Sequence, residues 1–224
     1  MLLELPGLLN EAQISKIFMI AKRAAFHDGR MTAGTAATKV KYNEELAATQ
    51  EGQELINRIL MSSLGHSTIF NNAALPAKMA DFIIARYTSG MTYGDHIDEP
   101  VMGSGGPRFR TDVSMTIFLN PPETYEGGEL VIRTTFGDKM VKLNAGDAVL
   151  YPSSSLHKVA EVTSGQRTVA LTWIQSMIRD PARREVLYDL VTVRDQLNEQ
   201  ESGSEMHQQI DRSYANLLRM WAEV

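Results

Sequence analysis

The sequence predicts a mainly β fold with flanking helices, in which short antiparallel strands form a sandwich or barrel. Two observations lead to this prediction. Between residues 78 and 178, short strand-like segments follow one another closely, with no helical pattern between them. On either side of this region, apolar residues recur at the spacing of amphipathic helices. The 224 residues and 43% hydrophobic content are enough for one sizeable core.

Two helices are predicted before the strands. Asn10 is a good N-cap, and Gln13 follows three residues later, as in a capping box. Apolar residues then continue at helical spacing, namely Ile14, Ile17, Phe18, Ala21 and Ala25. A second helix is predicted from about Gln50 to Leu64, and its apolar side comprises Leu55, Ile56, Ile59 and Leu60. Residues 27–43 break the pattern and are predicted to form an irregular loop.

Five segments carry the strand pattern, namely residues 79–87, 112–120, 127–143, 145–154 and 167–178. In the second of them, the apolar residues Val113, Met115, Ile117 and Leu119 alternate with Ser114, Thr116 and Phe118. Residues 127–143 are predicted to form two strands around a turn near Gly137. We therefore expect this region to supply the whole barrel.

The helical period returns after the last strand. One predicted helix has a face that comprises Leu187, Leu190, Val191, Arg194 and Leu197. A later predicted helix has an apolar face that comprises Met206, Ile210, Tyr214, Leu217, Leu218 and Trp221. The sequence thus divides into an N-terminal helical support (residues 1–77), a barrel domain (78–178) and a C-terminal helical extension (179–224). We expect the extension to lie outside the barrel. Its apolar faces can pack on the N-terminal helices or form a homodimer interface.

Composition excludes several classes of protein. The net charge of -5 and the pI near 5.6 give no sign of a nucleic-acid partner. No apolar run approaches the length of a membrane helix, and the start of the chain is a poor signal peptide. The chain has no cysteine, which rules out disulfides and thiolate metal sites and is consistent with a cytoplasmic location. Any metal must therefore be held by His, Asp or Glu.

A metal-binding pattern stands near the start of the strand region. His96 and Asp98 are two residues apart, so on a strand they point to the same face, and His157 supplies a third ligand. Two histidines and one carboxylate form the facial triad of non-haem iron(II) oxygenases, although zinc uses the same ligands in hydrolytic sites. Arg167 follows ten residues after His157, and its guanidinium suits the far end of a dicarboxylate.

Most of the chain resembles the iron(II)/2-oxoglutarate dioxygenases, and most closely the bacterial PKHD-type hydroxylases, which are relatives of prolyl 4-hydroxylase. The resemblance is carried by "HDGRMTAGTAATKVKYN", "RYTSGMTYGDHIDEPV", "RTDVSMTIFLNPPETYEGGEL" and "AGDAVLYPSSSLHKVAEVTSGQRTVALTWIQSMIRD". It implies a double-stranded β-helix (jelly-roll, cupin-like) core. It also implies hydroxylation of a C–H bond, in which 2-oxoglutarate and dioxygen are consumed and succinate and carbon dioxide are formed.

The resemblance also implies a role for each site residue. His96, Asp98 and His157 are expected to hold Fe(2+), and Arg167 to anchor 2-oxoglutarate. Tyr87 is expected to line the cosubstrate pocket, as is Tyr93. Ascorbate dependence is typical of the superfamily. Gly94 is expected to let the strand bend before the ligands, and Ile97 to point away into packing.

One position departs from the pattern of some prolyl hydroxylases, in which a tyrosine helps to bind the far carboxylate of 2-oxoglutarate. Phe118 occupies the matching position here and cannot donate a hydrogen bond. Arg167 therefore needs another helper, and Tyr87, Ser114 and Thr116 are the candidates. The glycine-rich residues 99–112 form either a lid over the substrate or a plain loop, and Arg110 among them is a candidate to meet an anionic group.

Two other functions fit the triad. A cupin-type zinc or manganese isomerase or hydrolase would keep the three ligands without needing Arg167. A non-catalytic iron or small-molecule binding module would keep the site without turnover. Within the dioxygenase reading, the substrate is either a prolyl residue of a protein or peptide, or a small molecule related to iron uptake.

Overall fold

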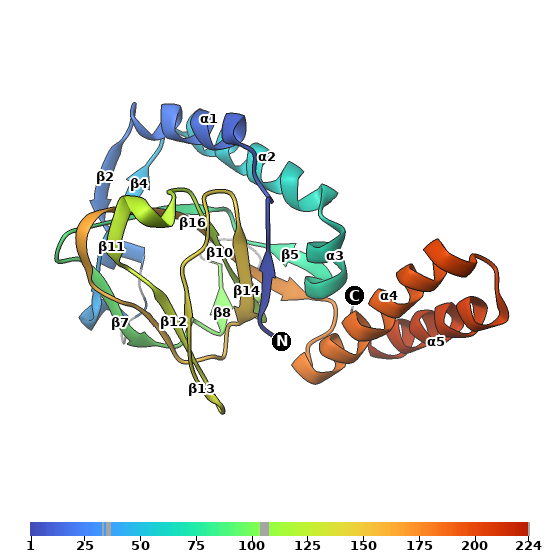
Figure 1. Cartoon of the computed structure of the whole chain (residues 1–224). Helices are drawn as coiled ribbons and strands as arrows, with labels where there is room; N and C mark the ends of the chain where they lie inside the picture. Colours follow the sequence, from blue (N-terminus) through green and yellow to red (C-terminus); the bar gives the residue numbers. More distant parts are fainter. Residues whose placement is uncertain (33, 35–36, 104–107, 224) are drawn as a thin grey trace.

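The computed structural model describes residues 1–32, 34, 37–103 and 108–223. Two antiparallel sheets face each other at the centre of the molecule, helices cover the outer face of one sheet, and a helical hairpin projects from the side (Figure 1). In the described residues, the larger sheet has nine strands, with β1-β14-β10-β16-β6-β4-β2 in order and β11 and β5 also paired with β16. The smaller sheet has the order β13-β12-β15-β7-β3. These two facing sheets form the predicted jelly roll.

The strands are short, apart from the long β16. Those of the larger sheet are β1 (Leu3–Leu5), β2 (Ala25–Asp28), β4 (Glu44–Ala47), β5 (Pro76–Met79), β6 (Ile83–Thr88), β10 (Val113–Phe118), β11 (Tyr125–Gly127), β14 (Ala148–Pro152) and β16 (Val162–Ser176). Those of the smaller sheet are β3 (Lys41–Tyr42), β7 (Thr92–His96), β12 (Leu130–Thr134), β13 (Gly137–Val141) and β15 (His157–Val159). A separate two-stranded ribbon comprises β8 (Val101–Met102) and β9 (Phe109–Arg110).

The larger sheet is buried on both faces because it lies between the helices and the smaller sheet. Successive side chains of a strand point to opposite faces. Thus Ile117 of β10 and Ile84 of β6 pack with the helices, whereas their neighbours Phe118 and Ala85 pack between the sheets. The alternation predicted for residues 112–120 therefore separates two buried faces, and its polar members Ser114 and Thr116 are interior residues.

Helices α1 (Glu11–Ala21) and α2 (Gln50–His66) cover the larger sheet (Figure 1). Both confirm predicted elements, and Asn10 and Gln13 form the expected capping box. Ile56 and Leu60 of α2 are fully buried, but Leu55 is 41% exposed, so its assignment to the apolar side was wrong. A short third helix, α3 (Thr68–Ala74), was not predicted, and short 3-10 turns occur at Gly29–Thr32, Ala37–Lys39 and Pro122–Thr124.

The N-terminal part of the chain also supplies strands. β1 pairs with β14, and β4 joins β2 to β6, so residues 1–77 extend the larger sheet as well as covering it. The predicted irregular loop at residues 27–43 includes the end of β2 and all of β3, while residues 33 and 35–36 lie outside the described part. Sheet pairing over a distance in sequence, rather than local pattern, orders this segment. The domain boundaries at 77/78 and 178/179 stay predictions.

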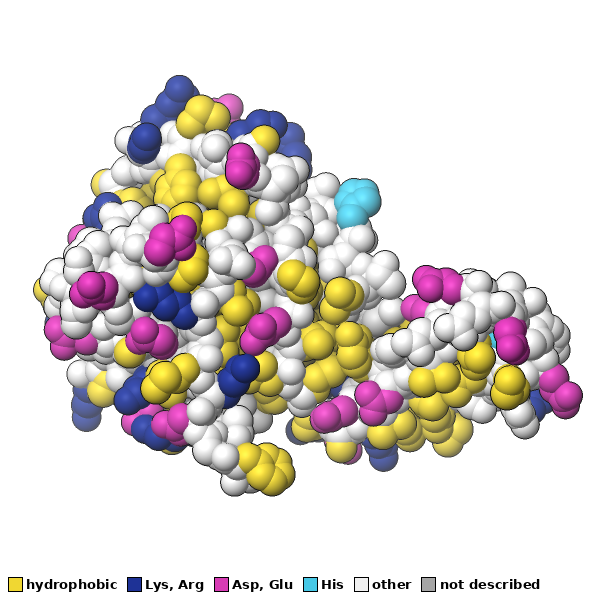
Figure 2. All heavy atoms as spheres, viewed as in Figure 1, with side chains coloured by type: hydrophobic (Ala, Val, Ile, Leu, Met, Phe, Trp, Pro, Cys, Tyr) yellow, Lys and Arg dark blue, Asp and Glu magenta, His cyan; other side chains and the backbone are white. Residues whose placement is uncertain are grey.

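Helices α4 (Pro181–Glu201) and α5 (Glu205–Trp221) form the projecting hairpin (Figure 1). Leu187 and Val191 of α4 are fully buried with Leu75 and Ile178 at the junction with the rest of the molecule. Figure 2 shows hydrophobic side chains gathered along this hairpin, and the exposed ones include Val186, Val193, Met206 and Met220. Among the described helices, none combines the length and the apolar composition needed to cross a lipid bilayer.

Candidate functional site

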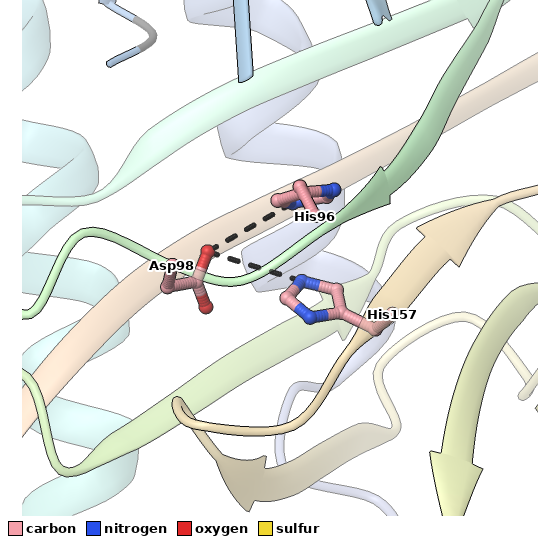
Figure 3. A group of neighbouring side chains, drawn as sticks. All are labelled: His96, Asp98 and His157. Carbon is pink, nitrogen blue, oxygen red and sulfur yellow. Dashed lines mark ion pairs between the residues drawn. The ribbon is translucent and has the colours of Figure 1, made fainter. Parts of the chain in front are cut away.

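The three predicted metal ligands come together at one end of the smaller sheet. His96 is the last residue of β7, and His157 begins β15, which pairs with it so that these two histidines are direct partners across the strands. Asp98 follows β7 in the connecting segment and turns back toward both rings (Figure 3). The strand thus ends before Asp98, and the carboxylate reaches the histidines from the loop rather than from the strand as predicted.

The ligand atoms face a common centre. The distance from Asp98 Oδ1 to His96 Nε2 is 3.9 Å, and to His157 Nε2 it is 3.8 Å. These gaps exceed a hydrogen bond, and one ligand atom from each residue lies within 4.8 Å of the others. Among the described residues, this is the cluster of His, Asp and Glu side chains with the geometry to hold a metal ion.

Hydrogen bonds to the backbone orient both imidazoles. His96 Nδ1 lies 2.8 Å from the carbonyl oxygen of Gly94, and His157 Nδ1 lies 2.9 Å from that of Ser155. Because a carbonyl only accepts, each Nδ1 carries the proton, and each Nε2 lone pair points to the common centre. Burial, followed by the neighbouring His157, lowers the pKa of His96 to about 4, so this imidazole is neutral near pH 7, as a metal ligand must be.

Aromatic rings hold the imidazoles in place. The Tyr93 ring stacks on His96 with centroids 3.6 Å apart and planes 9° apart. The Tyr151 ring meets His157 edge-on, with centroids 5.0 Å apart. Packing on one face and a hydrogen bond at Nδ1 leave each ring little freedom to rotate.

Asp98 is held by the buried Ser114, which in turn contacts the buried Ser153. Ser114 Oγ donates to Asp98 Oδ2 over 2.5 Å, and Ser114 Oγ and Ser153 Oγ are 2.7 Å apart. With Oδ2 engaged in this way, Oδ1 faces the two Nε2 atoms. The sequence suggested Ser114 as one candidate helper of Arg167, whereas in the structure its hydroxyl donates to the Asp98 carboxylate. The signal was present in the alternating strand, whose polar members face the interior.

Arg167 of β16 lines the same cavity as the triad. Its side chain is 1% exposed, and in the described structure its Nε and Nη1 have no hydrogen-bond partner. The guanidinium carbon lies 5.1 Å from the ring centre of Tyr87 and 5.5 Å from that of Phe118. A buried cation without an anion is strongly destabilising, so this site fits a carboxylate ligand between Arg167 and the triad.

The candidate helpers of Arg167 differ in their position relative to its guanidinium. Tyr87 is buried beside the guanidinium, and burial raises the pKa of its hydroxyl to about 12, so it is a neutral group. Thr116 lines the cavity and lies beside the hydroxyl of Tyr151. Tyr151 is a further cavity residue, which was not predicted from the sequence. Phe118 presents only its ring to Arg167.

One expectation about the surrounding segments needs correction, and two others take a specific form. Ile97 is 56% exposed and lines the cavity instead of packing inside. Gly94 is needed for close approach, since a Cβ there would lie 2.9 Å from Cβ of Val40. Arg110 meets anionic groups of the chain itself, Asp112 at 2.7 Å and Glu223 at 3.2 Å. The proposed lid includes residues 104–107, which lie outside the described part.

A buried ion pair forms another part of the cavity wall. Lys41 Nζ lies 2.6 Å from Glu45 Oε1, and Thr32 Oγ1 donates to the same carboxylate. Glu45 is 2% exposed, and no local pattern in the sequence marked this pair. Both partners are satisfied, so the pair is a fixed wall of the cavity and not a second metal site.

Comparison with known sequences agrees with this geometry. Residues 82–175, which contain the triad and Arg167, match the 2OG-Fe(II) oxygenase superfamily. A PKHD-type hydroxylase of Thioalkalivibrio sulfidiphilus is 48% identical over 224 residues, and one of Synechococcus elongatus is 42% identical over 223 residues. Each alignment covers the whole of both chains.

Solved structures share the fold at low sequence identity. A prolyl hydroxylase of Trichoplax adhaerens, solved with a hypoxia inducible factor peptide fragment, gives a TM-score of 0.59 at 15% identity, covering 83% of this chain and 86% of that one. The viral collagen prolyl hydroxylase of Paramecium Bursaria Chlorella virus-1 gives 0.56 at 18% identity, covering 78% and 96%. These structures confirm the predicted double-stranded β-helix. The family match and the full-length relatives confirm the predicted 2-oxoglutarate-dependent dioxygenase activity. The chain has full-length relatives among the PKHD-type hydroxylases and carries the His-Asp-His cluster in its jelly roll, so it belongs to the PKHD-type hydroxylases of the 2OG-Fe(II) oxygenase superfamily.

Proposed function

We propose that His96, Asp98 and His157 hold the iron(II) of this dioxygenase and that Arg167, assisted by Tyr87, binds the far carboxylate of 2-oxoglutarate. One observation carries this proposal. His96, Asp98 and His157 line a single cavity together with the buried Arg167, whose Nε and Nη1 have no hydrogen-bond partner among the described residues. The zinc or manganese cupin alternative explains the triad but leaves the arginine buried without an anion.

Iron(II) bound with 2-oxoglutarate and dioxygen supplies the oxidising chemistry, in which 2-oxoglutarate yields succinate and carbon dioxide and a substrate C–H bond gains a hydroxyl. The residues of the chain prepare the site for it. The carbonyls of Gly94 and Ser155 fix the imidazole tautomers, and Ser114 directs Asp98 Oδ1 to the centre. Three protein ligands leave metal positions open for the two cosubstrates.

The proposed substrate is a prolyl residue of a protein or peptide. Partly exposed apolar and aromatic side chains line the cavity beside the triad, and they are Tyr93, Ile97, Met102 and Trp173. Such a wall suits an apolar ring better than a charged metabolite. The structure of the Trichoplax adhaerens enzyme with its peptide fragment supports a peptide, while a small molecule related to iron uptake is the alternative.

Three further features stay predictions. The resemblance implies ascorbate dependence. The cysteine-free composition is consistent with a cytoplasmic location. The exposed apolar side chains of the α4–α5 hairpin are consistent with a homodimer, which sedimentation of the full chain would test.

Anaerobic titration tests the site. Iron(II) should bind with one-to-one stoichiometry, and added 2-oxoglutarate should give a weak visible charge-transfer band. Asp98→Ala should abolish stoichiometric iron binding. Arg167→Ala should retain iron but bind 2-oxoglutarate at least about tenfold more weakly, because a hydrogen bond to a charged group contributes about 1.5–3 kcal/mol.

The controls separate the alternatives. Arg167→Lys should rescue 2-oxoglutarate binding only in part, because an ammonium lacks the planar fork. Full 2-oxoglutarate affinity in Arg167→Ala would remove the arginine from the site and favour a cupin-type metal enzyme. Mass spectrometry of prolyl peptides after aerobic incubation should detect a gain of one oxygen that depends on 2-oxoglutarate, and a gain only on small molecules would reject the peptide substrate.

A further inference from the structure

Three buried tyrosines surround Arg167. They are Tyr87, Tyr125 and Tyr151, and the positive charge of Arg167 acts on the hydroxyl of each, lowering its pKa against the larger, opposite effect of burial. The net effect is a raised pKa in every case, so all three phenols are neutral near pH 7 and able to donate a hydrogen bond. The guanidinium therefore lies in a cluster of potential donors.

The three hydroxyls differ in their neighbours. Asn43 lies beside the hydroxyl of Tyr87, and Thr116 lies beside that of Tyr151. Arg167 lies beside the Tyr125 hydroxyl and lowers its pKa by its charge and as a hydrogen-bonding neighbour, while the acidic Glu129 raises it. The geometry of the hydroxyl nevertheless completes no hydrogen bond to a described residue. Buried polar atoms are rarely left unpaired. Tyr125 Oη and two nitrogens of Arg167 thus form a group of three unpaired buried atoms in one place.

Strand pairing places Tyr125 beside the arginine. Tyr125 opens β11 and pairs with Gly165, two residues before Arg167 on β16. A Cβ on Gly165 would lie 2.8 Å from the Tyr125 Cα. A Cβ on Gly128 would lie 3.0 Å from Arg167 Cδ and 3.2 Å from Tyr125 Cε2. Glycines at these two positions let the phenol and the arginine stem lie close together.

Lys142 also contacts Tyr125. Its Nζ donates to the Tyr125 carbonyl oxygen over 2.9 Å and lies 4.2 Å from the centre of the Tyr125 ring. Lys142 and the backbone at the two glycines both approach Tyr125, and these contacts limit the movement of its hydroxyl beside Arg167. Such a fixed donor loses little freedom when it binds a ligand.

We infer that the Tyr125 hydroxyl donates a hydrogen bond to the carboxylate that Arg167 binds, and that Tyr125 thereby selects for a cosubstrate with a second carboxylate. This inference rests on the proposed role of Arg167. It supplies the donor that Phe118 cannot provide, from a different strand. A monocarboxylic 2-oxo acid would leave both Tyr125 and Arg167 unpaired, and a site built to hydrogen-bond a group rejects the analogue that lacks it.

The test compares two cosubstrates in the absence of oxygen. Binding of 2-oxoglutarate and of 2-oxopentanoate, which carries a methyl group in place of the second carboxylate, is measured by calorimetry on the iron(II)-loaded protein. Tyr125→Phe should weaken 2-oxoglutarate about tenfold and leave 2-oxopentanoate unchanged. Tyr214→Phe, at another buried tyrosine far along the chain in α5, is the matched control and should change neither. Iron occupancy and the thermal midpoint are measured on the same samples.

Arg167→Ala and the double variant complete the experiment. Tyr125→Phe should still weaken 2-oxoglutarate in the Arg167→Ala background if the phenol touches the ligand itself. No further weakening there would make Tyr125 a support for the arginine and overturn the inference, as would equal weakening of both cosubstrates or no effect of Tyr125→Phe. If Arg167→Ala itself retains full 2-oxoglutarate affinity, the proposed anchor fails, and the inference fails with it.

Discussion

At the residue scale, the proposed metal site depends on groups outside the His96, Asp98 and His157 triad. Each of the three side chains directs one polar atom to the common centre, because its other polar atom is engaged in a hydrogen bond with a neighbour. The Gly94 and Ser155 carbonyls do this for the histidines, and Ser114 does it for Asp98. Outer hydrogen bonds of this kind set the orientation and basicity of metal ligands.

Ser114→Ala is expected to weaken iron(II) binding by about 10–100-fold, the usual cost of losing such a partner. The variant leaves Asp98 Oδ2 without its donor, so the carboxylate can turn away from the histidines. Anaerobic titration of iron(II) measures the effect. Ser153→Ala should have a smaller effect because Ser153 contacts Ser114 and not the ligand. Unchanged iron affinity in a folded Ser114→Ala protein would show that Asp98 is oriented by other means.

The pH dependence of the metal-free protein follows from His96. Its pKa falls from an ordinary value of about 6.5 to about 4, chiefly through burial, so the folded state binds its proton less well than the unfolded state. The stability that His96 contributes is complete above about pH 6.5 and is lost as the pH falls toward 4. Thermal midpoints across this range should therefore decline. His96→Gln, which does not titrate, should show a shallower decline, and identical profiles would contradict the assignment.

At the element scale, the ligand-bearing strand β7 is held in place by a close approach. The Gly94 amide donates to the carbonyl of Val40 over 2.9 Å, and the absence of a side chain on Gly94 lets Val40 lie directly against the strand. The same Gly94 carbonyl orients His96, so the position of this strand and the geometry of the metal site are linked.

Gly94→Ala is expected to destabilise the protein by about 1–3 kcal/mol, the range for overpacking, because the new Cβ would lie 2.9 Å from the Val40 Cβ. Iron affinity should fall as well. Gly65→Ala is the matched control, since Gly65 lies in α2 with no atom within 4 Å of the added Cβ. This change should stabilise by up to about 1 kcal/mol through helix propensity. Denaturant unfolding measures both, and equal effects would contradict the packing argument.

At the scale of the whole molecule, the jelly roll and the C-terminal hairpin share one small apolar junction. Leu187 and Val191 pack there with Leu75, which follows α3, and Ile178, which follows β16. The Nδ2 of Asn72 donates to Asp195 across the same contact. The hairpin is thus attached to the molecule through α4 and through Glu223 after α5, whose amide donates to the Met177 carbonyl and whose carboxylate pairs with Arg110.

Leu187→Ala is expected to cost about 2–5 kcal/mol, because the residue is fully buried at this junction and its truncation leaves a cavity. Val193→Ala, on the same helix but 45% exposed, should change stability by less than about 0.5 kcal/mol. Denaturant unfolding with circular dichroism gives both values. If Leu187→Ala is as stable as Val193→Ala, the hairpin is not anchored by this cluster.

The sequence alone determined the main elements and indicated the candidate ligands. Period-two and period-3.6 patterns placed the main strands and four of the helices, since those patterns record which side of a single element is buried. The spacing of His96 and Asp98, together with the later His157 and Arg167, was sufficient to indicate the metal and cosubstrate chemistry. The short strands β1 to β4 and helix α3 gave no comparable signal because their stability comes from partners distant in the chain.

Only the tertiary structure decided which polar groups meet inside the jelly roll. Ser114 binds Asp98, sixteen residues away, although the sequence suggested it for Arg167. Tyr125 lies beside Arg167 because β11 and β16 pair, and Ile97 is exposed because β7 ends at His96. A strand pattern states that a residue faces inward, but the stacking of the two sheets determines which side chain it finds there. The unpaired nitrogens of Arg167 are a property of that stacking, and no pattern within one strand records it.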